Sequence, residues 1–188
     1  MFNNFDASSF PIPPAFVGYA TKAVLILEFA PTIISLILAG KVGSYIASSI
    51  GTMRVSEQID ALDIMGVNSP NFLIFPKIIA CMLFNPLLIA ISIVFGIGGG
   101  YIAGLLTGNW TPNDYITGIQ MYMPNIFIYY AFTKTTVFAF IIATVPSYFG
   151  YFVKGGSLEV GRASTQAVVW TMVFIIISEL ILTQLILS

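Results

Sequence analysis

Long apolar stretches alternate with short polar ones along this chain. Four of the apolar stretches are long enough to cross about 30 Å of hydrocarbon at about 1.5 Å per residue, and they cover residues 17–50, 78–106, 126–148 and 167–187. Each is continuously apolar, whereas the strands of a membrane barrel alternate between apolar and polar positions. The pattern therefore predicts an all-α, polytopic membrane protein, with about four transmembrane helices in a single domain over residues 1–188.

Composition strengthens this interpretation. Hydrophobic residues make up 57% of the chain and charged residues 8%, and the mean hydropathy is +0.94. A soluble domain carries roughly 25% charged residues, so this chain could not cover the surface of a soluble fold. The net charge of −1 and the lack of a basic cluster also leave nucleic-acid binding without an electrostatic basis.

The sequence offers little for enzyme chemistry. It contains no histidine, which is the usual general base and the commonest metal ligand. Its single cysteine, Cys81, lies inside an apolar run. The G-x-x-x-x-G-K-S/T pattern of a P-loop ATPase is missing. We therefore expect no enzyme activity, catalytic residue, metal site or cofactor on this chain.

Basic residues in the loops predict the orientation of the spans. The loops at 51–77 and 149–166 carry Lys or Arg, whereas residues 1–17 and 107–125 carry none. Loops rich in Lys and Arg stay in the cytoplasm. The 51–77 and 149–166 loops are therefore expected to be cytoplasmic, and residues 1–17 to form an outer loop. Two basic residues fall toward the outer side and depart from this rule, Lys22 and Lys134.

A short charged segment separates the first two spans. It reads GTMRVSEQIDALDIMGVNSP. Its apolar residues Val55, Ile59 and Leu62 recur at helical spacing, which predicts a short amphipathic helix. Ser56 is expected to cap the start of this helix, and Gly66 with the following Asn-Ser-Pro to end it.

This helix has two possible uses. An amphipathic helix between spans can lie on the lipid surface. The acidic side chains of Glu57, Asp60 and Asp63 oppose that placement, because the cytoplasmic leaflet is itself anionic. A docking surface for a cytoplasmic protein fits the segment better, so we interpret residues 51–77 as a cytoplasmic coupling region.

Three ionisable residues fall inside the apolar spans: Glu28 in the first, Lys134 in the third and Glu179 in the fourth. Charges within a membrane are costly and mark either a structural pair or a functional pathway. A cavity for a polar headgroup or an ion would use such residues, and so would a proton-coupled transporter. The pattern leaves these interpretations open.

Small residues recur at helical spacing in the second span. Gly96, Gly100 and Gly104 form a G-x-x-x-G-x-x-x-G series, which lets helix backbones approach closely. Packing within the chain and a seam between two copies both fit this series. Pro31 and Pro86 lie inside spans and predict kinks there.

The stretch LEFAPTIISLILAGKVGSYIASSIGTMRVSEQIDALDIMGV, beginning at Leu27, closely resembles the signature region of MlaE-like (YrbE-like) permeases. These are the membrane subunits of bacterial ABC systems that move phospholipids between the inner and outer membranes. The family's central block reads approximately RELGP, AGRVG and GTMR-T-EQIDAL–MGV, and here it becomes LEFAP, AGKVG and GTMRVSEQIDALDIMGV. A second family pattern is similar to EVGRASTQAVV from Glu159 to Val169. The resemblance covers nearly the whole chain after about residue 20.

The resemblance implies a set of partners. Two permease copies form a homodimer in the bacterial inner membrane, with phospholipid in a cavity at its centre. Two copies of a separate ATPase, which carries the ATP and Mg²⁺, dock on the short cytoplasmic helix, and an MCE-domain lipid-binding protein sits on the outer side. The implied ATPase-docking residues are Arg54, Glu57, Asp60, Leu62 and Met65. The implied lipid-cavity residues are Leu27, Glu28, Lys134 and Glu179.

This chain departs from the family pattern in two respects. Leu27 replaces the arginine of RELGP, so a headgroup role of that arginine does not carry over. Family members also begin with an interfacial helix and a further transmembrane helix, which gives five spans, and neither is expected here. Two alternatives to a phospholipid permease therefore stay open: an ion-coupled secondary transporter that uses Glu28, Lys134 and Glu179, and a truncated, non-transporting remnant.

Overall fold

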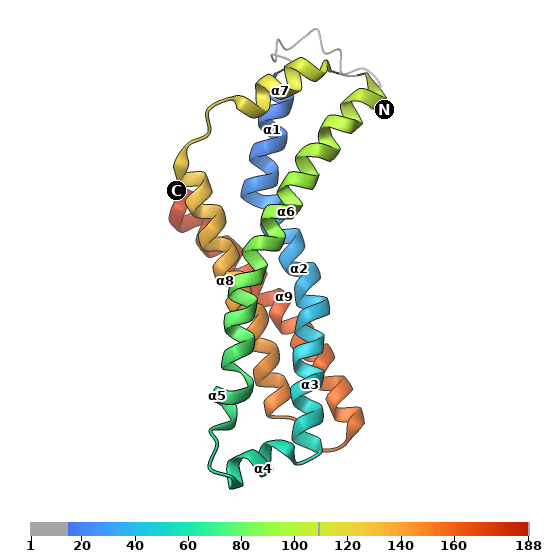
Figure 1. The fold of residues 1–188 in the computed structure, drawn as a ribbon, viewed down its shortest axis with the longest axis vertical. Coiled ribbons are helices and arrows are strands. Elements are labelled where there is room, and N and C mark those ends of the chain that lie inside the picture. The colour runs from blue at the N-terminus through green and yellow to red at the C-terminus, as the bar shows by residue number, and fades with distance from the viewer. Residues whose placement is uncertain (1–14, 109, 188) are drawn as a thin grey trace.

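The computed structural model describes residues 15–108 and 110–187, and the regular elements within them are all helices (Figure 1). Four helical segments are long and apolar enough to cross a membrane: Phe16–Val55, Ser69–Thr107, Asn125–Tyr151 and Ser157–Ile186. The all-α, polytopic fold with four spans is therefore confirmed. Most of the expected outer loop, residues 1–17, lies outside the described residues.

The first span is one continuous run of helix that contains two π-helical segments. It consists of α1 (Phe16–Val24), η1 (Leu25–Ile33), α2 (Ile34–Leu38), η2 (Ala39–Gly43) and α3 (Ser44–Val55). Pro31 lies inside η1, and a proline within a helix cannot donate a backbone hydrogen bond. The wider π-helical turn accommodates that gap, so the irregularity expected at Pro31 takes this form.

Short helices join the other spans. α4 (Gln58–Ile64) and α5 (Ser69–Leu73) precede α6 (Phe75–Thr107), and α7 (Pro112–Gln120) leads to α8 (Asn125–Tyr151) and α9 (Ser157–Leu187). Pro86 lies within α6, which continues past it. The helices extend beyond the predicted spans, and α9 begins ten residues before the predicted start at 167. Polar residues continue a helix outside the hydrocarbon, whereas the hydrophobic pattern records only the part inside.

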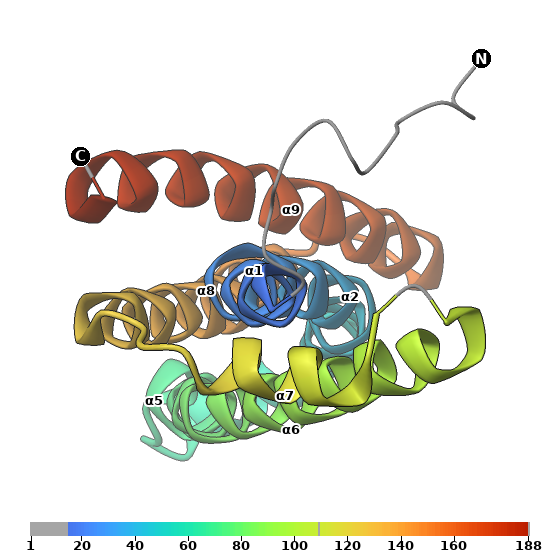
Figure 2. The same cartoon turned by 90° about the horizontal axis from the view of Figure 1, so that it is seen from above.

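The spans pack in three layers (Figure 2). α9 forms one outer layer and α6 the other, and α8 lies with the first span between them. In agreement, α8 contacts α9, α3 and α6. Figure 1 shows α4, α5 and the α8–α9 connection at one end of the molecule, and α7 with the start of α1 at the other. We call these the α4 end and the α7 end. The two loops predicted to be cytoplasmic share the α4 end, as four crossings require.

Small side chains let α3 and α8 touch closely near the α4 end. A Cβ atom added to Gly150 of α8 would lie 2.6 Å from the carbonyl oxygen of Ala47 on α3. Beside this contact, Ile46, Ile50 and Ile59 form a buried cluster. Because α8 is held in this way, its buried face reaches the centre of the bundle.

The glycine series of α6 packs within the chain. A Cβ atom added to Gly96 would meet a leucine side chain of η1, and Cβ atoms on Gly100 and Gly104 would meet the rings of Tyr115 and Trp110. The two rings stack with their centroids 6.3 Å apart. Of the two uses that the sequence leaves open for these glycines, the structure shows packing within one chain.

Candidate functional site

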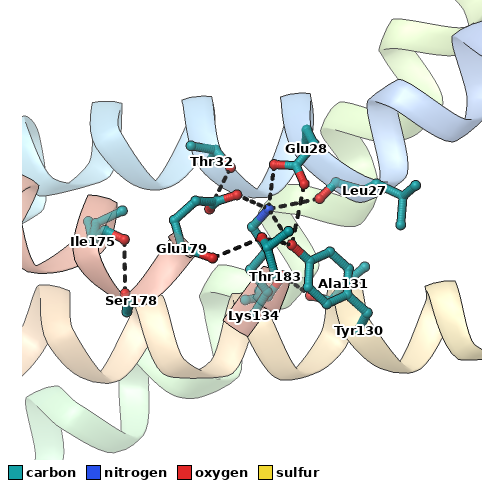
Figure 3. A network of polar contacts seen from close by, with 11 residues as sticks. Leu27, Glu28, Thr32, Tyr130, Ala131, Lys134, Ile175, Ser178, Glu179 and Thr183 are labelled. Atoms are coloured by element: carbon teal, nitrogen blue, oxygen red, sulfur yellow. Dashed lines mark hydrogen bonds and ion pairs between the residues drawn. The ribbon is translucent and has the colours of Figure 1, made fainter. Parts of the chain in front are cut away.

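An ion cluster joins three spans in the apolar part of the protein (Figure 3). Lys134 of α8 is fully buried, and its Nζ lies 2.8 Å from Oε2 of Glu28 on η1. The same Nζ forms an ion pair with Oε1 of Glu179 on α9. The three ionisable residues that the sequence places inside separate spans therefore meet at one point.

Hydroxyl groups complete this cluster (Figure 3). Lys134 also donates to the hydroxyl of Tyr130, at 3.2 Å. That hydroxyl donates to Oε1 of Glu28 at 3.3 Å and lies 2.7 Å from Oγ1 of Thr183. Oγ1 of Thr32 donates to Oε2 of Glu179 on α9, at 3.0 Å. Every charged group in the cluster therefore has more than one polar partner, which a buried charge requires.

Pro31 removes the α-helical donor of a backbone oxygen that takes part in the cluster. In an α-helix the carbonyl of Leu27 would accept from the N–H of residue 31, and proline has no N–H. The Leu27 oxygen accepts from Nζ of Lys134 at 2.9 Å. Leu27 stands where the family pattern has arginine, and it takes part in the cluster through its backbone.

Sequence reasoning missed three hydroxyl residues of the cluster, Thr32, Tyr130 and Thr183. Each lies four residues along the chain from one of the three charged residues. Residues at this spacing share a helix face, so the signal was present. It is weak on its own, because the chain has many Ser, Thr and Tyr residues near charges.

The cluster is closed at Lys134 and open at Glu28. The exposed fraction of the side chain is 0% for Lys134, 19% for Glu179 and 49% for Glu28. Two carboxylates share one ammonium, so their formal charge exceeds that of the lysine. An ion pair between a carboxylate and an ammonium is stronger where water is excluded. The arrangement can brace the first span against α8 and α9, and it presents one partly exposed carboxylate beside the brace.

α4 forms an exposed charged tip at the α4 end. Ile59 is fully buried and anchors this helix against Ile46 and Ile50 of α3. At the end of α3, Nη1 of Arg54 binds Oδ1 of Asp60 at 2.6 Å. A buried apolar contact and an ion pair therefore fix α4 to the first span.

Three of the five expected ATPase-docking residues are exposed: Glu57, Asp60 and Met65. Arg54 and Leu62 are half-buried. The guanidinium of Arg54 lies 5.8 Å from the ring centroid of Tyr151, in addition to its ion pair. It therefore positions α4 as well as facing solvent. Ile64, on the same tip, is 87% exposed. The helical period of the sequence did not point to it, because Ile64 is on a different face of the helix from buried Ile59.

The start of α4 differs from the prediction. Ser56 does not cap this helix: it ends α3, and its Oγ donates to the carbonyl of Thr52 at 2.8 Å. Glu57 adopts a left-handed backbone conformation, with φ of 59°, and turns the chain into α4, which begins at Gln58. Val55 belongs to α3 and not to the apolar face of α4. The first span thus runs through the predicted loop boundary, because its polar last turn still forms helix.

The end of α4 agrees with the prediction. Gly66 follows the helix with a φ of 77°, which glycine adopts without strain. Asn68 then caps α5, and its Oδ1 accepts from the N–H of Asn71 at 3.2 Å. Oγ of Ser69 lies 2.9 Å from the hydroxyl of Tyr151, which ties α5 to α8. The whole connection from α4 to α6 is therefore anchored to the bundle.

Lys22, which departs from the loop-charge rule, has local partners at the α7 end. Its Nζ donates to the carbonyl oxygens of Ile119 and Met121, at 2.8 and 2.7 Å. The last carbonyls of a helix lack partners within the helix and favour a nearby cation. Lys22 therefore stabilises the end of α7.

Tyr115 of α7 is tied to α6. Its hydroxyl donates to the carbonyl of Ile97 at 3.0 Å, and burial raises the pKa of this hydroxyl.

Known proteins resemble this chain over most of its length. The family described as Permease MlaE matches residues 7–185. A probable ABC transporter permease protein of Rickettsia bellii is 39% identical over 186 residues, which is 98% of this chain and 69% of the relative. One of Synechocystis sp. is 33% identical over 169 residues, 90% of this chain and 64% of the relative. The Arabidopsis thaliana protein TRIGALACTOSYLDIACYLGLYCEROL 1, chloroplastic, is 31% identical over 157 residues, 84% of this chain and 45% of the relative.

These matches agree with the structure. The matched range includes the first three spans, the fourth up to residue 185, the ion cluster and the α4 tip. The chain spans about two thirds of the length of the rickettsial relatives. It is a multi-pass membrane protein, and it belongs to the MlaE family of ABC transporter permeases.

Proposed function

We propose that this chain is the membrane subunit of an ABC system that moves phospholipid between the inner and outer membranes of a bacterium. A separate ATPase subunit hydrolyses ATP and docks on α4, and this chain has no enzyme activity of its own. Two copies form a homodimer in the inner membrane, and an MCE-domain lipid-binding protein meets it on the outer side. The observation that carries the proposal is the α4 tip, exposed and acidic yet fixed to the first span.

The geometry of the α4 tip suits the transmission of force. An ATPase that closes on ATP must push on an element that moves as one body with a span. Ile59 and the Arg54–Asp60 ion pair hold α4 to α3. From Arg54 the first span is continuous helix up to Glu28 of the ion cluster. A displacement of α4 is therefore passed to the level of the cluster.

A lipid is supported as the substrate class by two further points. Exposed Glu28 is followed in the chain by exposed Phe29, so η1 presents a polar and an apolar group at the same level. The printed name of the Arabidopsis relative also contains that of a diacylglycerol glycolipid. Both points favour a molecule with a polar head and an apolar body over a free ion.

An ion-coupled secondary transporter is supported less well. Glu28, Lys134 and Glu179 satisfy one another, which is the arrangement of a structural brace. The relatives are named as permeases of ABC transporters. Flux through reconstituted liposomes separates the two functions: the permease moves phospholipid only with the ATPase and ATP, and a secondary transporter moves ions without them.

Reversal of two acids on α4 tests the docking step. Glu57→Lys with Asp63→Lys changes two exposed carboxylates and leaves Asp60, and so the ion pair with Arg54, in place. We expect recovery of the ATPase with the tagged permease to fall at least about tenfold, a cost of about 1.4 kcal/mol. Glu159→Lys is the control, because it reverses a carboxylate of α9 at the same end. Full recovery of the ATPase with the double variant would contradict docking on α4.

A further inference from the structure

Lys41 is a basic residue inside a span that has no ionic partner among the residues that the structure describes. Lys41 lies in η2, its side chain is exposed, and no carboxylate comes within ion-pair distance of it. Lys22, Lys77 and Lys154 also lack an ion pair in the described part of the chain. Lys22 donates instead to two carbonyls at the α7 end, and Lys77 and Lys154 lie close to the helix ends at the α4 end. Lys41 is therefore the cation whose position calls for an explanation.

Lys41 lies well inside the long helical run of the first span, away from both of its ends. It precedes Val55, the last residue of the first span, by fourteen residues, which is about 21 Å at 1.5 Å per residue. In the other direction the span continues for a further twenty-five residues, to Phe16. A lone ammonium facing acyl chains is costly, so such residues face a polar group or a water-filled path.

Lys41 belongs to a stripe of exposed residues along the first span. Every fourth residue from Phe29 to Tyr45 is exposed, and this spacing keeps them on one side of the helix. The members of the stripe are Phe29, Ile33, Ile37, Lys41 and Tyr45.

The stripe is apolar toward the α7 end and polar toward the α4 end. Phe29, Ile33 and Ile37 are 55%, 41% and 60% exposed. Beyond them come Lys41 and Tyr45, flanked by two serines whose hydroxyls donate to the Lys41 and Tyr45 carbonyls, both at 3.1 Å. An ammonium, a phenol and hydroxyl oxygens therefore follow a run of three large apolar side chains.

These features match one phospholipid molecule. From Phe29 to Lys41 there are twelve residues, about 18 Å of helix, and one leaflet of hydrocarbon is about 15 Å thick. We propose that Lys41 binds the phosphate of a phospholipid whose acyl chain lies along Phe29, Ile33 and Ile37. This proposal rests on the proposed function and adds to it a residue that recognises the substrate.

Among the residues that the structure describes, no carboxylate offers an alternative partner for Lys41. Glu28 and Glu179 are held by Lys134. The exposed acids of α4, with Glu159 of α9, lie at the α4 end, and Asp114 lies at the α7 end. A second copy packed stripe to stripe about a two-fold axis would bring lysine toward lysine. An anion from a bound molecule fits this position, and the phosphate diester is the anion that the membrane supplies in excess.

Retention of added lipid by the purified permease–ATPase complex tests the proposal. The probes are phosphatidylglycerol and diacylglycerol, which has the same acyl chains and no phosphate, and bound lipid is measured by native mass spectrometry. The wild-type complex is expected to prefer phosphatidylglycerol. Lys41→Gln is expected to lower phosphatidylglycerol retention about tenfold, which is the order of a lost charged hydrogen bond, and to leave diacylglycerol retention unchanged. Lys41→Arg is expected to restore the preference.

Lys154→Gln is the matched control, because it removes another exposed lysine that lacks an ion pair in the described residues. It is expected to retain both lipids as the wild type does. Equal retention of phosphatidylglycerol by Lys41→Gln and wild type would overturn the site. So would efficient cross-linking of two copies through Tyr45→Cys, in a Cys81→Ser background, together with unchanged lipid retention, since a second copy would then cover the stripe.

The outcomes for the site and for the proposed function are distinct. If the wild-type complex moves phospholipid and Lys41→Gln moves and retains it equally well, the function stands and the site is wrong. If retention depends on Lys41 while the wild-type complex, supplied with ATP, moves no phospholipid, the site stands and the function is wrong.

Discussion

Nζ of Lys134 lies 2.8 Å from Oε2 of Glu28, although 106 residues separate the two along the chain. The same nitrogen pairs with Glu179, so a single ammonium joins the first span, α8 and α9. Because each carboxylate also accepts from a hydroxyl, the cluster resists separation of the three spans. It fixes the middle layer of the bundle to one outer layer at the depth where the first span turns π-helical.

Removal of the central charge is expected to destabilise the protein strongly. Lys134→Met keeps much of the volume and leaves Glu28 and Glu179 facing each other without a cation. Breaking a buried ion pair from one side costs about 3–5 kcal/mol, and we expect a loss at the lower end of this range, because Glu179 stays largely buried while Glu28 is half-exposed. Thermal unfolding of the purified protein in detergent measures this loss.

Neutralising the partners is expected to restore much of that stability. Lys134→Met combined with Glu28→Gln and Glu179→Gln removes all three charges. Replacement of a buried ion cluster by neutral side chains of similar shape often costs little stability. The triple variant should therefore unfold at a higher temperature than Lys134→Met alone. If it is no more stable than the single variant, lost packing and not an unpaired charge causes the defect.

A single methyl group is expected to separate α7 from α1. A Cβ atom on Gly118 would meet the backbone of Ala15, Gly18 and Tyr19. Backbone atoms cannot move aside as a side chain can, so we expect Gly118→Ala to cost about 1–3 kcal/mol. Tryptophan fluorescence should report the change, because Trp110 stacks on a ring of α7. Gly98→Ala is the control, since nothing lies within 4 Å of its Cβ position.

Glycine at position 57 is expected to be tolerated better than any branched residue. Glu57 has a φ of 59° at the turn between α3 and α4, and this conformation costs a residue with a Cβ atom about 1–2 kcal/mol. Glu57→Gly should therefore be at least as stable as the wild type, and Glu57→Val less stable. Thermal unfolding of both variants measures the order. The reverse order would mean that the charge of Glu57, and not its backbone, determines the stability of the turn.

The sequence predicts the spans because membrane burial leaves a strong one-dimensional signal. The four apolar stretches reappear as four long helices, and Glu28, Lys134 and Glu179 stand out because charges are rare inside them. Their meeting point is not predictable from spacing, since it depends on how three layers pack. The partners Thr32, Tyr130 and Thr183 were missed because a hydroxyl four residues from a charge is a weak signal on its own.

The error at α4 has a local cause. The helical period of Val55, Ile59 and Leu62 suggests one amphipathic helix, but the chain turns at Glu57 between the first two of them. Period alone cannot reveal a single left-handed residue in a run of helix formers. Ile59 nevertheless lies in the core, as the apolar pattern requires.

Lys22 is expected to hold the end of α7 through its charge. Its Nζ is bound by the carbonyls of Ile119 and Met121, and Lys22→Met removes both hydrogen bonds while keeping a long apolar chain. We expect a loss of about 1 kcal/mol, reduced from the buried value because the site is partly exposed to solvent. Hydrogen exchange should then quicken over the last turn of α7, about fivefold for 1 kcal/mol, and stay unchanged in α8. Lys22→Arg should keep the protection, since a guanidinium also donates to two carbonyls. Equal exchange in Lys22→Met and wild type would show that the close contact at Gly118, and not the lysine, holds this helix.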